Sequence, residues 1–153
     1  SHMIVHKDSP VNNLDDLLKM SKNLTFSNGD PNSTSGFLVP SYYVFSKNKV
    51  DPKTMFKAVR GANHEANALA VANKQIDVAT NNSETLGRIK DHMPEKASMI
   101  KVIWTSPLIP SDPMVIRSDL DPAVNTKIQD FFYGYGSNDT EKDTLIQQSL
   151  IHI

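Results

Sequence analysis

The 153-residue sequence contains no cysteine, which excludes disulfides, thiolate metal sites and a cysteine nucleophile. It also lacks a polybasic run, and its 16 basic residues nearly balance its 17 acidic ones, which argues against a nucleic-acid partner. No apolar stretch approaches the ~18 residues of a membrane span, and the chain carries no secretory signal. An anionic ligand would therefore have to be bound by local dipoles and hydrogen bonds, because bulk positive charge is missing.

Motifs of common enzyme classes are missing as well. The loop over 29–36 lacks the Gly-Lys-Ser/Thr ending of a nucleotide-binding P-loop, and no Gly-x-Ser-x-Gly elbow occurs. His64-Glu65 begins like a zinc-protease motif, but Ala68 takes the place of the second histidine. The other histidines have no metal-site spacing. We predict no enzymatic activity, no metal site and no cofactor.

Strands and helices alternate in the hydrophobic pattern, which predicts a three-layer α/β fold. Its open sheet is mixed but mostly parallel, with helices on both faces. Ser1-His2-Met3 is typical of an expression-tag remnant, so we expect a single lobe over residues 4–153. Pro40 falls inside a predicted helix and is expected to distort it. The predicted strands are 4–6, 24–26, 56–59, 76–79, 100–105 and 114–116, and the longer helices are 35–46, 66–73, 84–90, 121–132 and 140–150.

Polar stretches directly follow several predicted strands, at 28–35, 61–65, 80–84 and 106–112. Ligands of open α/β sheets gather at the carboxyl ends of the strands, so these stretches are expected to converge. In the first stretch, three hydroxyl residues sit where a loop turns into a helix. Unpaired N–H groups and the helix dipole favour an anion there. The simpler alternative is that Ser33 or Ser35 only caps the helix.

Four segments carry a resemblance to a known family: GDPNSTSGFLVPSYYVF (29–45), HEANALAVANKQ (64–75), DVATNN (77–82) and SPLIPSDP (106–113). They resemble the substrate-binding proteins of phosphonate ABC importers, in that family's order and approximate spacing. The resemblance implies the second lobe of a two-lobed, type II periplasmic binding protein, with a first lobe outside this sequence. It also implies a periplasmic or otherwise extracytoplasmic location, with lipid anchoring of the parent protein left open.

The resemblance also implies which residues contact the phosphonate oxygens. Ser33, Thr34 and Ser35 match hydroxyl and backbone donors, and His64 matches a further donor. Charge-assisted hydrogen bonds to such an anion are the stronger kind. The simpler alternative for His64 is that it caps the alanine-rich helix or satisfies a buried backbone group.

Two acidic residues bear on the kind of ligand. Glu84 and Asp112 match the family's acidic residues that receive the ammonium group of 2-aminoethylphosphonate. Two carboxylates would repel a plain phosphate, so they favour an aminoalkylphosphonate. The alternatives are that Glu84 only complements the dipole of its helix and that Asp112 only forms a turn.

The sequence is thus expected to be part of the solute-binding component of an ABC importer. This component would capture 2-aminoethylphosphonate or a related alkylphosphonate, with an ABC permease and an ATPase as partners implied by the resemblance. Two alternatives stay open. The same scaffold could bind phosphate or phosphite, or the excised lobe could act only as an assembly module, as a homodimer or by swapping an element.

Overall fold

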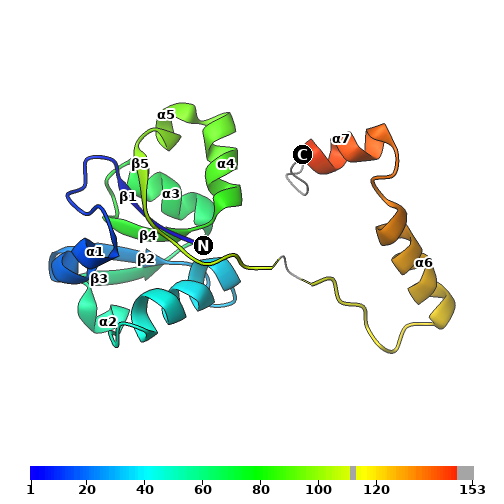
Figure 1. Cartoon of the computed structure of the whole chain (residues 1–153), viewed down its shortest axis with the longest axis horizontal. Helices are drawn as coiled ribbons and strands as arrows, with labels where there is room; N and C mark the ends of the chain where they lie inside the picture. The colour runs from blue at the N-terminus through cyan, green and yellow to red at the C-terminus, as the bar shows by residue number, and fades with distance from the viewer. Residues whose placement is uncertain (111–112, 148–153) are drawn as a thin grey trace. The chain divides into compact units, whose positions relative to one another are not determined.

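The computed structural model describes residues 1–110 and 113–147, and it divides the chain into two units, Ser1–Ile109 and Pro110–Ile153. The sequence predicts a single lobe over residues 4–153, and the two units are described one after the other. The first unit contains a five-stranded sheet with the order β3-β2-β4-β1-β5 (Figure 1). Its strands are β1 (His2–His6), β2 (Thr25–Asn28), β3 (Ala58–Gly61), β4 (Val78–Asn81) and β5 (Ile100–Thr105).

Strand directions confirm the predicted mixed, mostly parallel sheet. β2 is parallel to β3 and β4, whereas β1 is antiparallel to both of its neighbours, β4 and β5. Four strands therefore end at one edge, and β1 begins there, with His2 opposite Asn81 and Thr105. His2 and Met3, which the sequence analysis set aside from the fold, are thus paired strand residues.

Helices cover both faces of this sheet (Figure 1). α1, η3 and α2 supply side chains to one core cluster, and α3 and α4 supply side chains to the other, against which α5 also packs. Their bounds are α1 (Leu14–Met20), η1 (Ser21–Asn23), η2 (Thr34–Leu38), η3 (Ser41–Ser46), α2 (Pro52–Met55), α3 (His64–Ala72), α4 (Ser83–His92) and α5 (Pro94–Ala97).

Alternation along the strands separates the two clusters. Met3 and Val5 face the cluster around Phe26, and Ile4 between them faces the cluster under α3 and α4. Phe26 is fully buried, and its ring stacks on Phe56 with 4.7 Å between centroids. Burying one such side chain contributes about 1.5–3 kcal/mol. The two clusters pack on opposite faces of the sheet and stabilise it, and the candidate site lies at one edge of this sheet.

The helix predicted around Pro40 is present, and it is distorted. η2 and η3, on either side of this proline, have π-helical hydrogen bonds, such as Leu38 N to Ser33 O at 3.1 Å. Proline has no N–H, so the Gly36 carbonyl lacks the donor it would have in a regular α-helix. That carbonyl accepts a hydrogen bond from Gly29 N at 3.0 Å. The distorted helix is thereby tied to the loop that leads into it.

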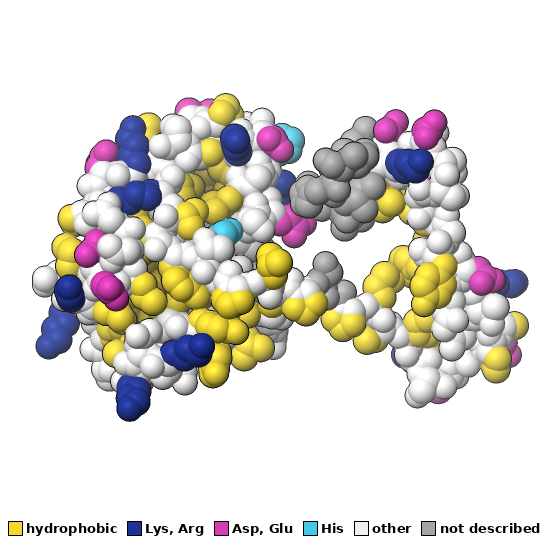
Figure 2. Space-filling model, viewed as in Figure 1, with side chains coloured by type: hydrophobic (Ala, Val, Ile, Leu, Met, Phe, Trp, Pro, Cys, Tyr) yellow, Lys and Arg dark blue, Asp and Glu magenta, His cyan; other side chains and the backbone are white. Residues whose placement is uncertain are grey.

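The second unit contains α6 (Pro122–Gly134) and α7 (Asp139–Gln147). No residue of α6 is buried, and Figure 2 shows hydrophobic side chains along it. The strand predicted at 114–116 is wrong. These residues pair with no strand in the described part of the chain, and Met114 and Val115 are 66% and 87% exposed. A short apolar run becomes a strand only where a neighbouring strand can pair with it.

Smaller differences concern element ends. β3 and β4 both begin two residues later than predicted, and α7 begins one residue earlier. The last three residues of the predicted helix 140–150 lie outside the described residues. Over 1–110 and 113–147, no helix is both long and apolar enough to cross a membrane.

Candidate anion-binding site

Three of the four polar stretches meet at the carboxyl edge of the sheet. Ser35 Oγ lies 3.1 Å from His64 Nε2 and 3.4 Å from Asn82 Nδ2. These residues come from η2, the start of α3 and the residue before α4. The fourth stretch reaches the same place through the first residue, because the Ser1 ammonium donates to Ser106 Oγ at 3.1 Å and Ser1 Oγ donates to the Ser35 carbonyl at 2.6 Å. Ser1 belongs to the expected tag remnant, so the expected convergence is confirmed for three of the four stretches.

The loop into η2 depends on two glycines that touch. A Cβ added at Gly29 would lie 2.6 Å from the backbone of Gly36. A Cβ added at Gly36 would lie 2.8 Å from His64 Cε1 and 2.9 Å from Ser33 Oγ. Only glycine permits such an approach. The pair of glycines therefore brings the hydroxyl residues of the loop against α3.

The first turn of η2 offers several hydrogen-bond donors. Ser33 is its N-cap, and Ser33 Oγ accepts from Gly36 N at 3.0 Å. Ser33 therefore does cap the helix, as the simpler alternative proposed. It does so as an acceptor, and its own hydroxyl hydrogen can still be donated. The N–H groups of Thr34 and Ser35 have no acceptor among the described residues. Unpaired N–H groups at a helix start are a common element of anion sites.

His64 does not cap α3. Asn63 is the cap, and its side chain accepts from Ala66 N at 2.8 Å. The half-buried His64 side chain instead contacts Ser35 through Nε2, and its Nδ1 atom is buried without a hydrogen-bond partner in the described part of the chain. The capping alternative for this histidine is therefore wrong.

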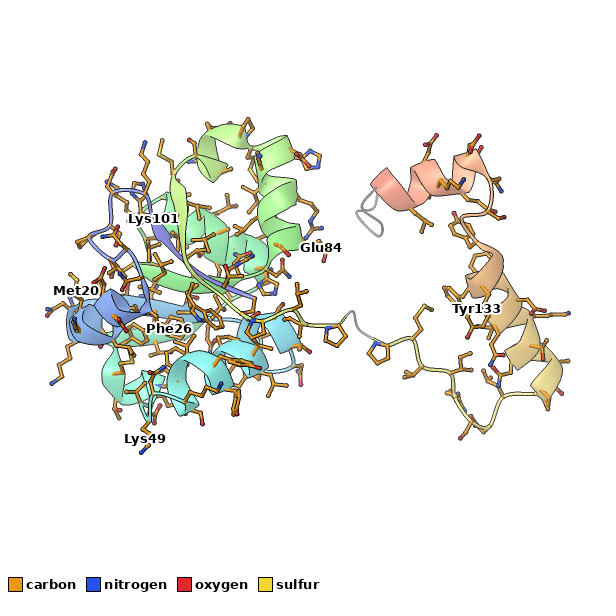
Figure 3. The ribbon with its side chains drawn as sticks, in the orientation of Figure 1. Met20, Phe26, Lys49, Glu84, Lys101 and Tyr133 are labelled. Carbon is orange, nitrogen blue, oxygen red and sulfur yellow. The ribbon has the colours of Figure 1, made fainter. Side chains whose placement is uncertain are left out.

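Electrostatics favour a neutral His64. Burial lowers the pKa of its imidazole, and the Ser1 ammonium lowers that pKa further, whereas the Glu84 carboxylate raises it. Glu84 lies exposed in the first turn of α4 (Figure 3), close enough to act on the imidazole through charge. Asp112, the second acidic residue expected at the site, lies outside the described residues.

Two asparagines that the sequence analysis did not single out complete the cluster. Asn81 is fully buried, and its Nδ2 donates to the His64 carbonyl at 2.7 Å while its Oδ1 accepts from Asn82 N at 2.9 Å. Asn82 is the N-cap of α4, with Oδ1 accepting from Thr85 N at 2.8 Å. The signs of this role in the sequence were their place in a polar stretch directly after a buried strand and in the segment DVATNN (77–82).

A third asparagine lies beneath the site. Asn67 in α3 is 1% exposed and links the ends of two strands to this helix. Its Oδ1 accepts from Ser27 Oγ at 2.6 Å, and its Nδ2 donates to the carbonyls of Asn28 and Thr80 at 3.1 and 3.3 Å. Asn67 thereby fixes the strand ends from which the loop and the Asn81–Asn82 pair depart.

Across the described residues, no three His, Asp or Glu side chains gather as metal ligands.

This geometry defines a class of protein: an open α/β lobe with a cluster of hydrogen-bond donors at the carboxyl edge of its sheet. Residues 1–152 match the family described as "ABC transporter, phosphonate, periplasmic substrate-binding protein". The match covers nearly the whole chain, and the chain belongs to this family. The resemblance stated from the four sequence segments is confirmed. The family is one of substrate-binding transport proteins and not of enzymes.

Individual relatives agree with this assignment. A phosphonates-binding periplasmic protein of Escherichia coli is 59% identical over 145 residues, which are 95% of this chain and 43% of the relative. A solved binding protein of a Pseudomonas aeruginosa ABC phosphonate transporter is 54% identical, with a TM-score of 0.91 over 95% of this chain and 48% of that one. The chain therefore spans less than half the length of these relatives.

A more distant relative has been solved with a ligand. It is a probable phosphite-binding protein of an ABC transporter from Prochlorococcus marinus, 28% identical over 79% of this chain and 42% of the relative. Its structure in complex with methylphosphonate has a TM-score of 0.58 over 69% of this chain and 40% of that one.

Proposed function

We propose that this chain is the second lobe of a two-lobed periplasmic receptor that binds phosphonates and delivers them to an ABC permease driven by an ATPase. Family membership supports the class of ligand, and the length of the relatives supports a further lobe outside this chain. The observation that carries the proposal is the first turn of η2, where two N–H groups without an acceptor in the described chain lie among the hydroxyls of residues 33–35.

The chemistry of this turn suits a tetrahedral oxyanion. Backbone N–H groups and hydroxyls donate to its oxygens, and the helix start adds about 0.3–1 kcal/mol at an exposed site. His64 Nε2 lies 3.1 Å from Ser35 Oγ, so His64 acts on the ligand through the Ser35 hydroxyl. Closure of a first lobe over this edge would remove water and strengthen each hydrogen bond. The lobe alone is therefore expected to bind weakly.

Titration of the 153-residue chain by NMR tests the half-site. We expect methylphosphonate to shift the amide resonances of residues 33–35 and the ring resonances of His64, with millimolar affinity. Micromolar binding would show that the missing lobe contributes little. Absence of shifts at these residues would show that methylphosphonate does not bind at this site.

For the ligand, we propose 2-aminoethylphosphonate, because Glu84 and Asp112 match the family's ammonium-binding acids. Calorimetry on a two-lobed protein that contains this lobe tests the role of Glu84. We expect Glu84→Ala to weaken 2-aminoethylphosphonate several-fold and to leave methylphosphonate unchanged, whereas Glu95→Ala, at an exposed acid of α5, changes neither. An equal loss of affinity for both ligands would show that Glu84 does not bind the ammonium group.

Phosphite is the second candidate ligand, since the Prochlorococcus marinus relative bears the name of a probable phosphite-binding protein. Phosphite offers the same oxygens to residues 33–35 but no group for Glu84. If phosphite binds the two-lobed protein more tightly than either phosphonate does, the phosphonate assignment is replaced by phosphite.

A further inference from the structure

We propose that Asn82 is a positioning residue of the anion site, which acts with His64 to fix the Ser35 hydroxyl as a donor toward the ligand. No sequence motif pointed to this role, and it follows from the hydrogen bonds around Ser35 Oγ. The identity of the ligand rests on the proposed function, whereas the arrangement of the three side chains exists before any ligand binds.

The orientation of the Asn82 amide is fixed by the helix that it caps. A backbone N–H can only donate, so the atom that meets Thr85 N at 2.8 Å is the amide oxygen. The amide nitrogen therefore faces Ser35 Oγ, at 3.4 Å. An NH₂ group has no lone pair to offer in a hydrogen bond, so at this contact the Ser35 oxygen accepts.

The position of the proton on His64 follows from burial. Its Nδ1 is buried and has no partner in the described chain, and a buried N–H without an acceptor is rarer than a buried acceptor without a donor. Nε2 has an oxygen at 3.1 Å, that of Ser35. We therefore assign the proton to Nε2, which makes His64 the second donor to Ser35 Oγ. Asn81 Nδ2 donates to the His64 backbone carbonyl at 2.7 Å and so holds the backbone of this residue in place.

The hydrogen of the Ser35 hydroxyl is then still free to be donated. A hydroxyl oxygen accepts at two lone pairs and donates one hydrogen. Asn82 and His64 occupy both lone pairs, so the hydrogen must go to an acceptor outside the cluster. The nearby N–H groups of Thr34 and Ser35 are donors and cannot take it. Ser35 is only half-buried, so water can accept this hydrogen, and an oxyanion bound at the first turn of η2 would take the place of that water.

The affinity test compares two caps. Asn82→Ser keeps an N-cap for α4 but is too short to reach Ser35. The control is Asn63→Ser, the same change at the cap of α3, whose side chain bonds Ala66 N. In NMR titrations of the 153-residue chain with methylphosphonate, we expect Asn82→Ser to weaken binding about three- to ten-fold. Asn63→Ser should leave affinity unchanged while lowering the melting temperature as much as Asn82→Ser does.

Coupling separates positioning from a general structural effect. In a Ser35→Ala background, Asn82→Ser should not weaken methylphosphonate binding further, because the hydroxyl that it orients is gone. An equal loss in both backgrounds would overturn the proposal, and so would unchanged affinity in Asn82→Ser alone.

A ligand-free measurement keeps this proposal separate from the proposed function. Long-range ¹H–¹⁵N correlation of the His64 ring should show the proton on Nε2 in the wild-type chain. A proton on Nδ1 would overturn the proposal whatever the ligand is. If the proton lies on Nε2 but neither methylphosphonate nor phosphite shifts the Ser35 amide, the proposed function fails and the arrangement around Ser35 stands.

Discussion

At the scale of single residues, the site depends on two glycines that leave no room for a side chain. In Gly29→Ala the new Cβ would lie 2.6 Å from the Gly36 backbone, which cannot move aside as a flexible side chain could. We expect a loss of about 1–3 kcal/mol in the free energy of unfolding, measured with urea. The matched control is Gly87→Ala in α4, where a Cβ meets nothing within 4 Å. It should gain about 0.5–1 kcal/mol, because alanine favours a helix. A neutral Gly29→Ala would contradict the close approach of the two loop segments.

His64 should make stability depend on pH. Its pKa in the folded chain is lowered, chiefly by burial, so the unfolded chain binds a proton first as the pH falls. The stability that His64 contributes is complete above the unfolded pKa of about 6.5 and declines as the pH falls from there toward the folded pKa. We expect the urea midpoint to fall more steeply from pH 7 to pH 5 in the wild type than in His64→Gln. Equal slopes would show that His64 does not titrate differently in the two states.

How far the site could be predicted differs from residue to residue. The hydroxyl triplet and His64 follow strands of one sheet, so their meeting was predictable from the order of elements. The part played by Asn82 was not, because it depends on which end of an amide faces Ser35, and the cap of α4 decides this only in three dimensions. Ser33 serves as a cap, as its sequence position also allowed.

At the scale of elements, Asn67 joins α3 to the ends of β2 and β4. Asn67→Ala would leave Ser27 Oγ and two strand carbonyls without this partner in a buried place. The Asn28 carbonyl keeps a second donor, Ala62 N at 3.1 Å. Because each lost hydrogen bond costs about 1 kcal/mol and a buried group left unsatisfied about 1–3 kcal/mol, we expect a total loss of about 2–4 kcal/mol in the free energy of unfolding. Asn73→Ala, at the exposed end of the same helix, should change it by less than ~0.5 kcal/mol. A loss below ~1 kcal/mol for Asn67→Ala would contradict its linking role.

Elements were predictable where the pattern is local. The alternation of strands and helices indicated the sheet and its helical faces, and Pro40 indicated a distorted helix. The antiparallel direction of β1 was not indicated, because it follows from pairing with β4 and β5, far along the chain. The apolar run at 114–116 misled for the same reason, since pairing and not composition makes a strand.

At the scale of the whole molecule, the first unit contains all five strands and both core clusters that pack on the sheet. Both core clusters consist of residues up to Ile103, and the candidate site residues described by the structure end with Glu84. The second unit, by contrast, has no buried residue in its longest helix. The apolar positions of α6 have the spacing of the buried face of a core helix, and the prediction of one lobe rested partly on them.

This difference predicts how a shortened chain behaves. Residues 1–109 alone should fold with the melting temperature of the 153-residue chain and the same amide shifts at residues 33–35, because no core side chain is removed. Residues 110–153 alone should show little helix by circular dichroism, since an isolated helix of 13 residues, the length of α6, is marginal in water. A melting temperature more than ~5 °C lower for residues 1–109 would show that the second unit stabilises the sheet, and helical spectra for residues 110–153 would show that it folds independently.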